Sequence, residues 1–232
     1  TIKPLIYSYA IHRGSRWSDL LSDAPVSHFS EEREQLWRPK RHRRTRGRGV
    51  RMVDALAYSL NAPILHLTRR LGINSTREWL SEFGLSDQPH DLTLALGSAC
   101  ATPVTLSLAY AQVAQERRRT VQEKWFNIPR TLSERLYREG LSPLDLWLTP
   151  SAMREAMVTA LKVHREDVLA EGRRRLKSTL KSTSEALSAV VKRGTAKAAH
   201  RLKFEVRGKT GTHERSDTWF VGYRPQRLTT VW

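Results

Sequence analysis

The chain contains 232 residues, and its 39% hydrophobic content with seven tryptophans excludes a disordered polypeptide. This length suits one large domain or two small ones with a substantial core. Forty lysines and arginines against 23 acidic residues give a net charge of +17, which favours anionic partners: nucleic acid, acidic lipid or an anionic polymer.

The first half of the chain is predicted to be mainly helical. Pro4 suits the first turn of a helix that runs from Thr1 to about Gly14. Residues 15–49 lack helical periodicity and are predicted to be irregular. Further helices are predicted from Val50 to just before Ser59, then up to Gly72, from a cap at Ser75 to Gly84, and from Pro103, capped by Thr102, to about Gln115.

The second half of the chain ends in strands. Residues 116–183 are basic and less regular, with a helix opening at Thr149 and Pro150, and a separate helix is predicted from Ser184 to Gly194. The hydrophobic period then changes to two, which predicts strands leading into 208–212 and over 218–223 and 228–232. Helices first and strands last predict a mixed α/β (α+β) domain with an antiparallel sheet.

Several features exclude or disfavour particular functions. The single cysteine, Cys100, allows neither an internal disulfide nor a cysteine zinc site, and the histidines lack metal-ligand spacing, so we expect no metal and no cofactor. The basic run Lys40–Gly49 contains no aromatic residue, so a stacking site for nucleic acid is not favoured. No apolar run reaches about 18 residues, the length that spans a bilayer.

Three short motifs, each common by itself, lie far apart: Thr1-Ile2-Lys3-Pro4, Ser59-Leu60-Asn61 and Lys209-Thr210-Gly211-Thr212. Their order is similar to the Ser-x-x-Lys, Ser-Asp-Asn and Lys-Thr-Gly set of penicillin-binding proteins and serine β-lactamases. The middle motif has leucine in place of aspartate. The first motif matches if a serine directly precedes Thr1.

Longer stretches resemble the transpeptidase domain of class A (bifunctional) penicillin-binding proteins nearly end to end, although the resemblance thins between Glu116 and Thr183. They include Ser22–Val26, Leu36–Pro39, Arg51–Leu56, Asn61–Pro63, Leu94–Ser98, Val190–Thr195 and Asp217–Tyr223. Trp37 and the strand with Trp219 and Phe220 bring the resemblance closest to the 1B type. Trp219 and Phe220 are expected to pack in the core. The resemblance implies an antiparallel sheet flanked by helices, with a largely helical subdomain.

The resemblance also implies a role for each motif residue. Lys3, three positions after the expected serine on one helix, would be its base, Ser59 would relay a proton to the leaving amine, and Asn61 would hold Lys3 and the substrate amide. Lys209 would lower the pKa of Lys3 and attract a terminal carboxylate.

The rest of the third motif would bind the substrate directly. The hydroxyls of Thr210 and Thr212 would grip the carboxylate, and Gly211 would allow close approach of the strand. The N–H of Thr212 would form an oxyanion hole with that of the serine.

The implied activity is peptidoglycan D,D-transpeptidation through a serine acyl-enzyme on D-Ala-D-Ala stem peptides. The implied partners are stem peptides, the lipid-linked precursor, β-lactams and other cell-wall synthesis proteins. The implied location is the periplasmic face of a bacterial inner membrane. The domain (residues 1–232) would be cut at both ends, lacking N-terminal strands, a last strand, the serine and a membrane anchor, and so inactive by itself.

Three alternatives remain open. A D,D-carboxypeptidase shares all three motifs and differs only in its acceptor. A serine β-lactamase needs a deacylating carboxylate, for which Glu166–Ala170 has a passing likeness to the required loop. A basic protein that binds nucleic acid or a membrane surface would be retained on DNA in a salt-sensitive manner and would not react with penicillin.

Overall fold

The computed structural model describes residues 1–30, 35–37, 49–98, 101–114, 151–213, 217–225 and 227–232. The chain divides into two compact units, residues 1–118 with 178–232 and residues 119–177. All three motifs belong to the first of these units. In the described part of the chain, no helix combines the length and the apolar character that crossing a membrane requires.

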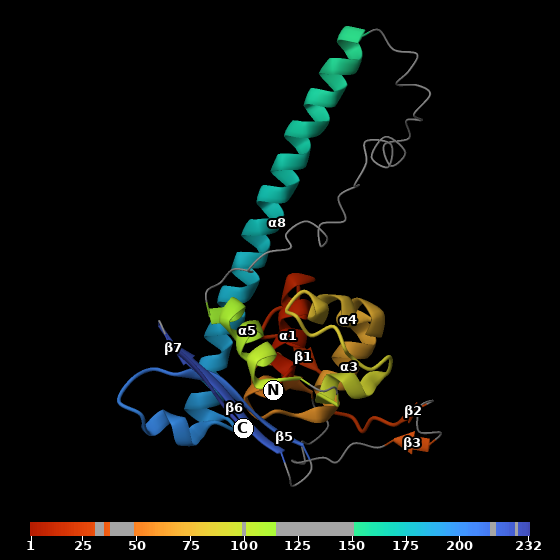
Figure 1. The fold of residues 1–232 in the computed structure, drawn as a ribbon. Coiled ribbons are helices and arrows are strands. Elements are labelled where there is room, and N and C mark those ends of the chain that lie inside the picture. The colour runs from red at the N-terminus through yellow and green to blue at the C-terminus, as the bar shows by residue number, and fades with distance from the viewer. Residues whose placement is uncertain (31–34, 38–48, 99–100, 115–150, 214–216, 226) are drawn as a thin grey trace. The chain divides into compact units, whose positions relative to one another are not determined.

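The first unit contains a group of helices with α1 at its centre. They are α1 (Lys3–His12), α2 (Met52–Ala57), α3 (Asn61–Leu71), α4 (Ile73–Ser81), the 3-10 helix η1 (Leu92–Leu96) and α5 (Pro103–Ala114). Every residue of α1 from Lys3 to Ala10 is buried, and the helix packs against α2, α3 and α4 (Figure 1). A helix buried on all sides belongs to the core, so its first residues are fixed by their surroundings.

Two predicted helix caps have different outcomes. Thr102 accepts a hydrogen bond of 3.0 Å from the backbone N–H of Thr105, which confirms the cap of α5. The cap predicted at Ser75 is wrong, because α4 begins at Ile73, directly after Gly72. Gly72 has a φ of +87°, a conformation that glycine adopts without strain, so α3 can end and α4 begin at this one residue.

Four short strands occur where the sequence predicted mainly irregular chain. β1 (Leu20–Leu21) pairs with β4 (Val50–Arg51), and β2 (His28–Ser30) pairs with β3 (Gln35–Trp37), both antiparallel. Strands of two or three residues carry too little hydrophobic alternation to be recognised in a sequence. α2 follows β4 directly, and both strands of the β1–β4 pair contact α2.

One long helix replaces the two that were predicted after residue 149. α8 spans Ser151–Arg193 without a break, so the predicted start at Ser184 is wrong, whereas the end before Gly194 is confirmed. Residues 166–170 lie inside this helix and form no loop of the kind a β-lactamase would need. A Cβ at position 194 would collide with the carbonyl oxygen of Ala57, so only glycine allows the chain to pass α2 here.

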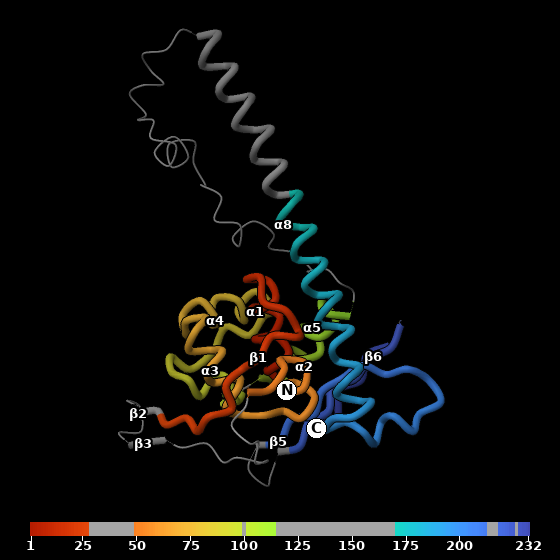
Figure 2. The backbone as a smooth tube through the Cα atoms, turned by 180° about the vertical axis from the view of Figure 1, so that it is seen from behind, coloured from red at the N-terminus to blue at the C-terminus, as the bar shows by residue number. Residues whose placement is uncertain are grey.

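After the short 3-10 helix η3 (Lys197–Arg201), three antiparallel strands complete the first unit in the order β5 (Arg207–His213), β6 (Asp217–Arg224) and β7 (Arg227–Val231). This confirms the predicted antiparallel end of an α+β domain. α5 packs against β6 and β7, where the hydroxyls of Ser107 and Thr230 are 2.5 Å apart. In the sheet seen from opposite sides in Figures 1 and 2, β6 lies between β5 and β7, so the C-terminal strand β7 is separated from β5.

Candidate active site

The first motif is buried at the start of α1. The side chain of Lys3 lies in the interior, and its Nζ donates hydrogen bonds to Asn61 Oδ1 at 2.6 Å, to the Ser59 carbonyl at 2.7 Å and to the Leu60 carbonyl at 3.2 Å. All three acceptors belong to the second motif, more than fifty positions along the chain. The first two motifs therefore form one cluster.

The second motif occupies the sharp connection between α2 and α3. Ser59 has a φ of 54°, in the left-handed region that a residue with a side chain adopts only at a cost. This conformation accompanies the turn that presents two successive carbonyls to Lys3. Asn61 is the first residue of α3, and no side chain caps the N-terminus of that helix. The amide oxygen of Asn61 accepts the hydrogen bond from Lys3 instead.

The third motif lies on the first strand of the sheet. Lys209 is 1% exposed, and its Nζ donates to the Thr210 carbonyl at 2.9 Å. Burial lowers the pKa of Lys209 to about 7, because a charged ammonium is poorly solvated there. At neutral pH a substantial fraction of Lys209 is therefore uncharged when no anion is bound.

Lys3 is affected by both its burial and the charge of Lys209. Burial lowers the pKa of Lys3 well below its usual value, and the positive charge of Lys209 lowers it further. The same causes, burial first and then Lys209 and Lys3, lower the pKa of the Thr1 amine to about 4. The backbone nitrogen of Thr1 and the two lysine side chains therefore share one buried region.

The start of the chain lies directly against the third motif. A Cβ at position 211 would approach the Thr1 nitrogen to 2.7 Å, so the strand comes this close only because Gly211 has no side chain. On the other side, the Tyr110 hydroxyl donates to the Thr1 carbonyl at 2.7 Å. Thr1 is thus held between α5 and β5.

The two threonines of the third motif have different surroundings. Thr210 is half-buried, and its hydroxyl donates to the hydroxyl of Thr195 at 2.6 Å. Thr212 is exposed and lines a small cavity of about 90 Å³, together with Thr1 and Gly211. Trp219, expected in the core, is instead half-buried and lines the same cavity. Its neighbour Phe220 is half-buried as well, and its ring packs against Gly208 and Gly222 of the sheet.

Sequence reasoning assigned no role to two residues that the structure connects to the motifs. Thr195 binds Thr210 through its hydroxyl, and its backbone N–H donates to the Ala57 carbonyl at 3.0 Å, at the end of α2. Tyr110 holds Thr1, as described above. Thr195 belongs to a stretch that carried the family resemblance, but neither contact follows from residue type or spacing.

The cluster contains two amines, a side-chain amide and several hydroxyls, a donor set that suits acid–base chemistry and anion binding. Among the residues the structure describes, no group of three or more histidine, cysteine or acidic side chains could hold a metal ion.

Known proteins resemble this chain over most of its length. Residues 1–116 and 148–232 match the family described as "Penicillin binding protein transpeptidase domain". The chain is 31% identical over 245 residues to penicillin-binding protein 1A of Vibrio cholerae, an alignment that covers the whole chain but only 29% of that protein. This relative is of the 1A type, so it supports the class A resemblance but not the predicted 1B type.

Solved structures give the same fold at lower identity. The structure of penicillin-binding protein 1A from Haemophilus influenzae matches with a TM-score of 0.64 and 21% identity, over 99% of this chain and 36% of that one. The imipenem acyl-enzyme complex of penicillin-binding protein A from M. tuberculosis matches with a TM-score of 0.57 and 16% identity, over 97% of this chain and 50% of that one.

Proposed function

Because the chain belongs to the penicillin-binding protein transpeptidase family, we propose that it carries the acyl-transfer site of a class A peptidoglycan D,D-transpeptidase, which cross-links D-Ala-D-Ala stem peptides and is acylated by β-lactams. The observation that carries this proposal is the hydrogen bond from Lys3 to Asn61, with Lys209 close enough to lower the pKa of Lys3. The hydrogen bond joins the first two motifs and the charge effect adds the third.

The nucleophile in this proposal is a serine directly before Thr1. Its carbonyl carbon would be bonded to the Thr1 nitrogen, which lies in the same buried region as both lysines and against Gly211. Lys3, the first residue of α1, would then follow the serine by three positions.

The chemistry assigned to the chain's residues is proton transfer. Burial and Lys209 lower the pKa of Lys3, which favours its uncharged form, and in that form Lys3 accepts the serine proton as the serine oxygen attacks the penultimate D-alanine carbonyl. The C–N bond of the terminal D-alanine breaks, and its amine leaves with a proton relayed through the Ser59 hydroxyl. An amine of a second stem peptide then attacks the ester, releases the serine and forms the cross-link. Asn61 keeps Lys3 oriented throughout.

The strand motif is assigned to binding. A ligand carboxylate near Lys209 would raise the pKa of that lysine and restore its charge, so binding would stabilise the ion pair that holds the substrate. Thr210 and Thr212 add hydroxyl donors, and Gly211 lets the ligand approach the strand. The backbone N–H of Thr212 and that of the serine are the proposed oxyanion hole, in which one donor contributes about 3 kcal/mol.

The chain spans 29% of the length of its Vibrio cholerae relative, and the proposal extends to the whole protein. We propose that the whole protein binds lipid-linked precursor and other cell-wall synthesis proteins at the periplasmic face of the inner membrane, through an anchor outside these 232 residues. The assignment to the 1A type follows the name of the Vibrio cholerae relative and replaces the 1B assignment. These residues by themselves are proposed to be inactive.

Labelling with a fluorescent penicillin tests the proposal. The full-length polypeptide is expected to form one adduct, located by peptide mass spectrometry on a serine directly before Thr1. The matched serine-to-alanine variant is expected to form none. No covalent labelling, or an adduct on another residue, would disprove the mechanism. Release of D-alanine without cross-linked product in the presence of an acceptor amine would identify a carboxypeptidase instead.

A further inference from the structure

A second and larger cavity lies at the opposite end of the three-stranded sheet from Gly211 and Thr212. It has a volume of about 490 Å³ and is lined by residues at the start of β5, the end of β6 and the start of β7, together with α5 and α8. One wall is apolar, formed by Ala111, Ala114 and Leu228. Such a volume lies in the range of small-molecule sites.

The floor of this cavity is a buried polar network centred on Ser184. Ser184 is 2% exposed, and its hydroxyl oxygen accepts hydrogen bonds from Arg207 Nη1 at 2.8 Å and from the Tyr223 hydroxyl at 3.0 Å. Arg207 Nε also lies 3.5 Å from Glu205 Oε1, the one carboxylate among the lining residues. These contacts fix the Arg207 guanidinium at the cavity wall and use two of its five N–H donors.

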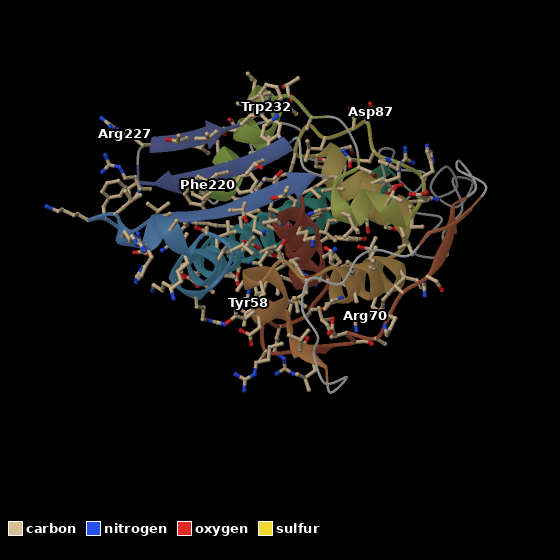
Figure 3. The ribbon with its side chains drawn as sticks, turned by 90° about the horizontal axis from the view of Figure 1, so that it is seen from below. Tyr58, Arg70, Asp87, Phe220, Arg227 and Trp232 are labelled. Atoms are coloured by element: carbon tan, nitrogen blue, oxygen red, sulfur yellow. The ribbon has the colours of Figure 1, made fainter. Side chains whose placement is uncertain are left out.

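Two further guanidiniums come from the turn between β6 and β7. Arg224 and Arg227 are direct cross-strand partners and both line the cavity. Like charges in this position destabilise a hairpin. Figure 3 shows Arg227 and Trp232 at opposite ends of β7, and Arg224 lies three residues beyond Val221, the cross-strand partner of Lys209. The Arg224 guanidinium lies 4.9 Å from the centre of the Phe204 ring, a cation–π contact that holds it in place.

Three arginines and one carboxylate line this cavity, and two of the arginines, Arg207 and Arg224, are fixed by their contacts. This arrangement suits an anion. We propose that this cavity binds a soluble small molecule that carries a phosphate or carboxylate group on a short apolar chain. The anion lies between Arg224, Arg227 and Arg207, where it offsets the repulsion of the cross-strand pair, and the chain lies along Ala111 and Leu228. This site is separate from the proposed transpeptidase chemistry.

Titration calorimetry of the full-length polypeptide at low salt tests this site. Hexyl phosphate and hexanoate are the anionic probes, and hexanol is the neutral control. We expect saturable binding of at least one anion with a stoichiometry of one and no binding of hexanol. The variant R224Q/R227Q is expected to bind the anion at least about tenfold more weakly, because charge-assisted hydrogen bonds are lost. It should retain penicillin labelling, which verifies its fold and separates this site from the active site.

The control variant R173Q/R175Q removes the same charge from exposed positions on α8. It is expected to leave the affinity for hexyl phosphate unchanged. Equal weakening in both double variants would reduce the effect to net charge and overturn the proposal, as would no saturable binding of either anion. Retention on phosphatidylglycerol vesicles without any binding of hexyl phosphate would also overturn it, since the ligand would then be a membrane surface.

Discussion

Lys3 Nζ lies 2.6 Å from Asn61 Oδ1, a contact that joins residues 58 positions apart in the sequence. It fixes the direction of the lysine amine in a region where water cannot compete, because Lys3 is buried. A buried amine beside a second cation is favoured in its uncharged form. The acid–base function proposed for this chain depends on that preference.

Replacing Lys3 by methionine is expected to slow acylation by a fluorescent penicillin about 10²- to 10⁴-fold, the usual contribution of a general base. The matched control is Lys203→Met, at an exposed position of the same first unit. Acylation rates and melting temperatures of the full-length variants check this. A folded Lys3→Met protein that reacts at the normal rate would exclude Lys3 as the base.

The variant Asn61→Asp is expected to shift the pH dependence of acylation. A carboxylate in place of the amide oxygen favours the charged form of Lys3 and raises its pKa. Less free base is then present at pH 7, so the rate falls there and recovers at higher pH. Asn61→Ala removes the hydrogen bond without adding charge. It should lower the acylation rate without moving the rise of that rate to a higher pH. An identical pH profile for both variants would contradict this explanation.

Lys209→Met is expected to increase stability while it abolishes function. The folded protein has a Lys209 pKa of about 7, against about 10.4 for an unfolded lysine. Between these two pKa values the unfolded state binds more protons than the folded state. The contribution of Lys209 to the unfolding free energy therefore rises with pH over this range and is lowest below pH 7. Methionine removes this dependence and the cost of burying a charge. Denaturant unfolding at pH 6 and pH 9 should show the gain at pH 6, on the order of 1 kcal/mol or more.

The same variant should react with penicillin orders of magnitude more slowly, since the cation proposed to attract the ligand carboxylate is absent. Lys192→Met, exposed on α8, is the control for loss of one positive charge. A Lys209→Met protein that is less stable at pH 6 than at pH 9 by the same margin as the parent would show that Lys209 is not the titrating group.

Thr195 is expected to act by positioning Thr210. Thr195→Val keeps the shape but removes the hydroxyl that accepts from Thr210, and a single exposed hydrogen bond of this kind contributes about 1 kcal/mol. Acylation efficiency should therefore fall about three- to tenfold, with little change in melting temperature. Thr195→Ser should restore the normal rate. A normal rate in Thr195→Val together with a loss in Thr195→Ser would point to packing of the methyl group instead of the hydrogen bond.

The sequence allowed the long, regular elements to be predicted. Pro4 predicted the start of α1, Thr102 predicted the start of α5, and the period of two predicted the last three strands. It failed where tertiary contacts override local signals. Ser184 is a strong helix-start residue, yet α8 runs through it because its hydroxyl accepts hydrogen bonds from Arg207 and Tyr223.

The sequence by itself determined which chemical groups are available, because three motifs in order specify two lysines, an asparagine and a glycine-containing strand. Only the tertiary structure decided that these groups are neighbours and how they titrate. The lowered pKa values of Lys3 and Lys209 arise from burial and from the charge of one lysine near the other. Burial and the distance between charges belong to the folded chain, since no spacing along the sequence fixes either of them.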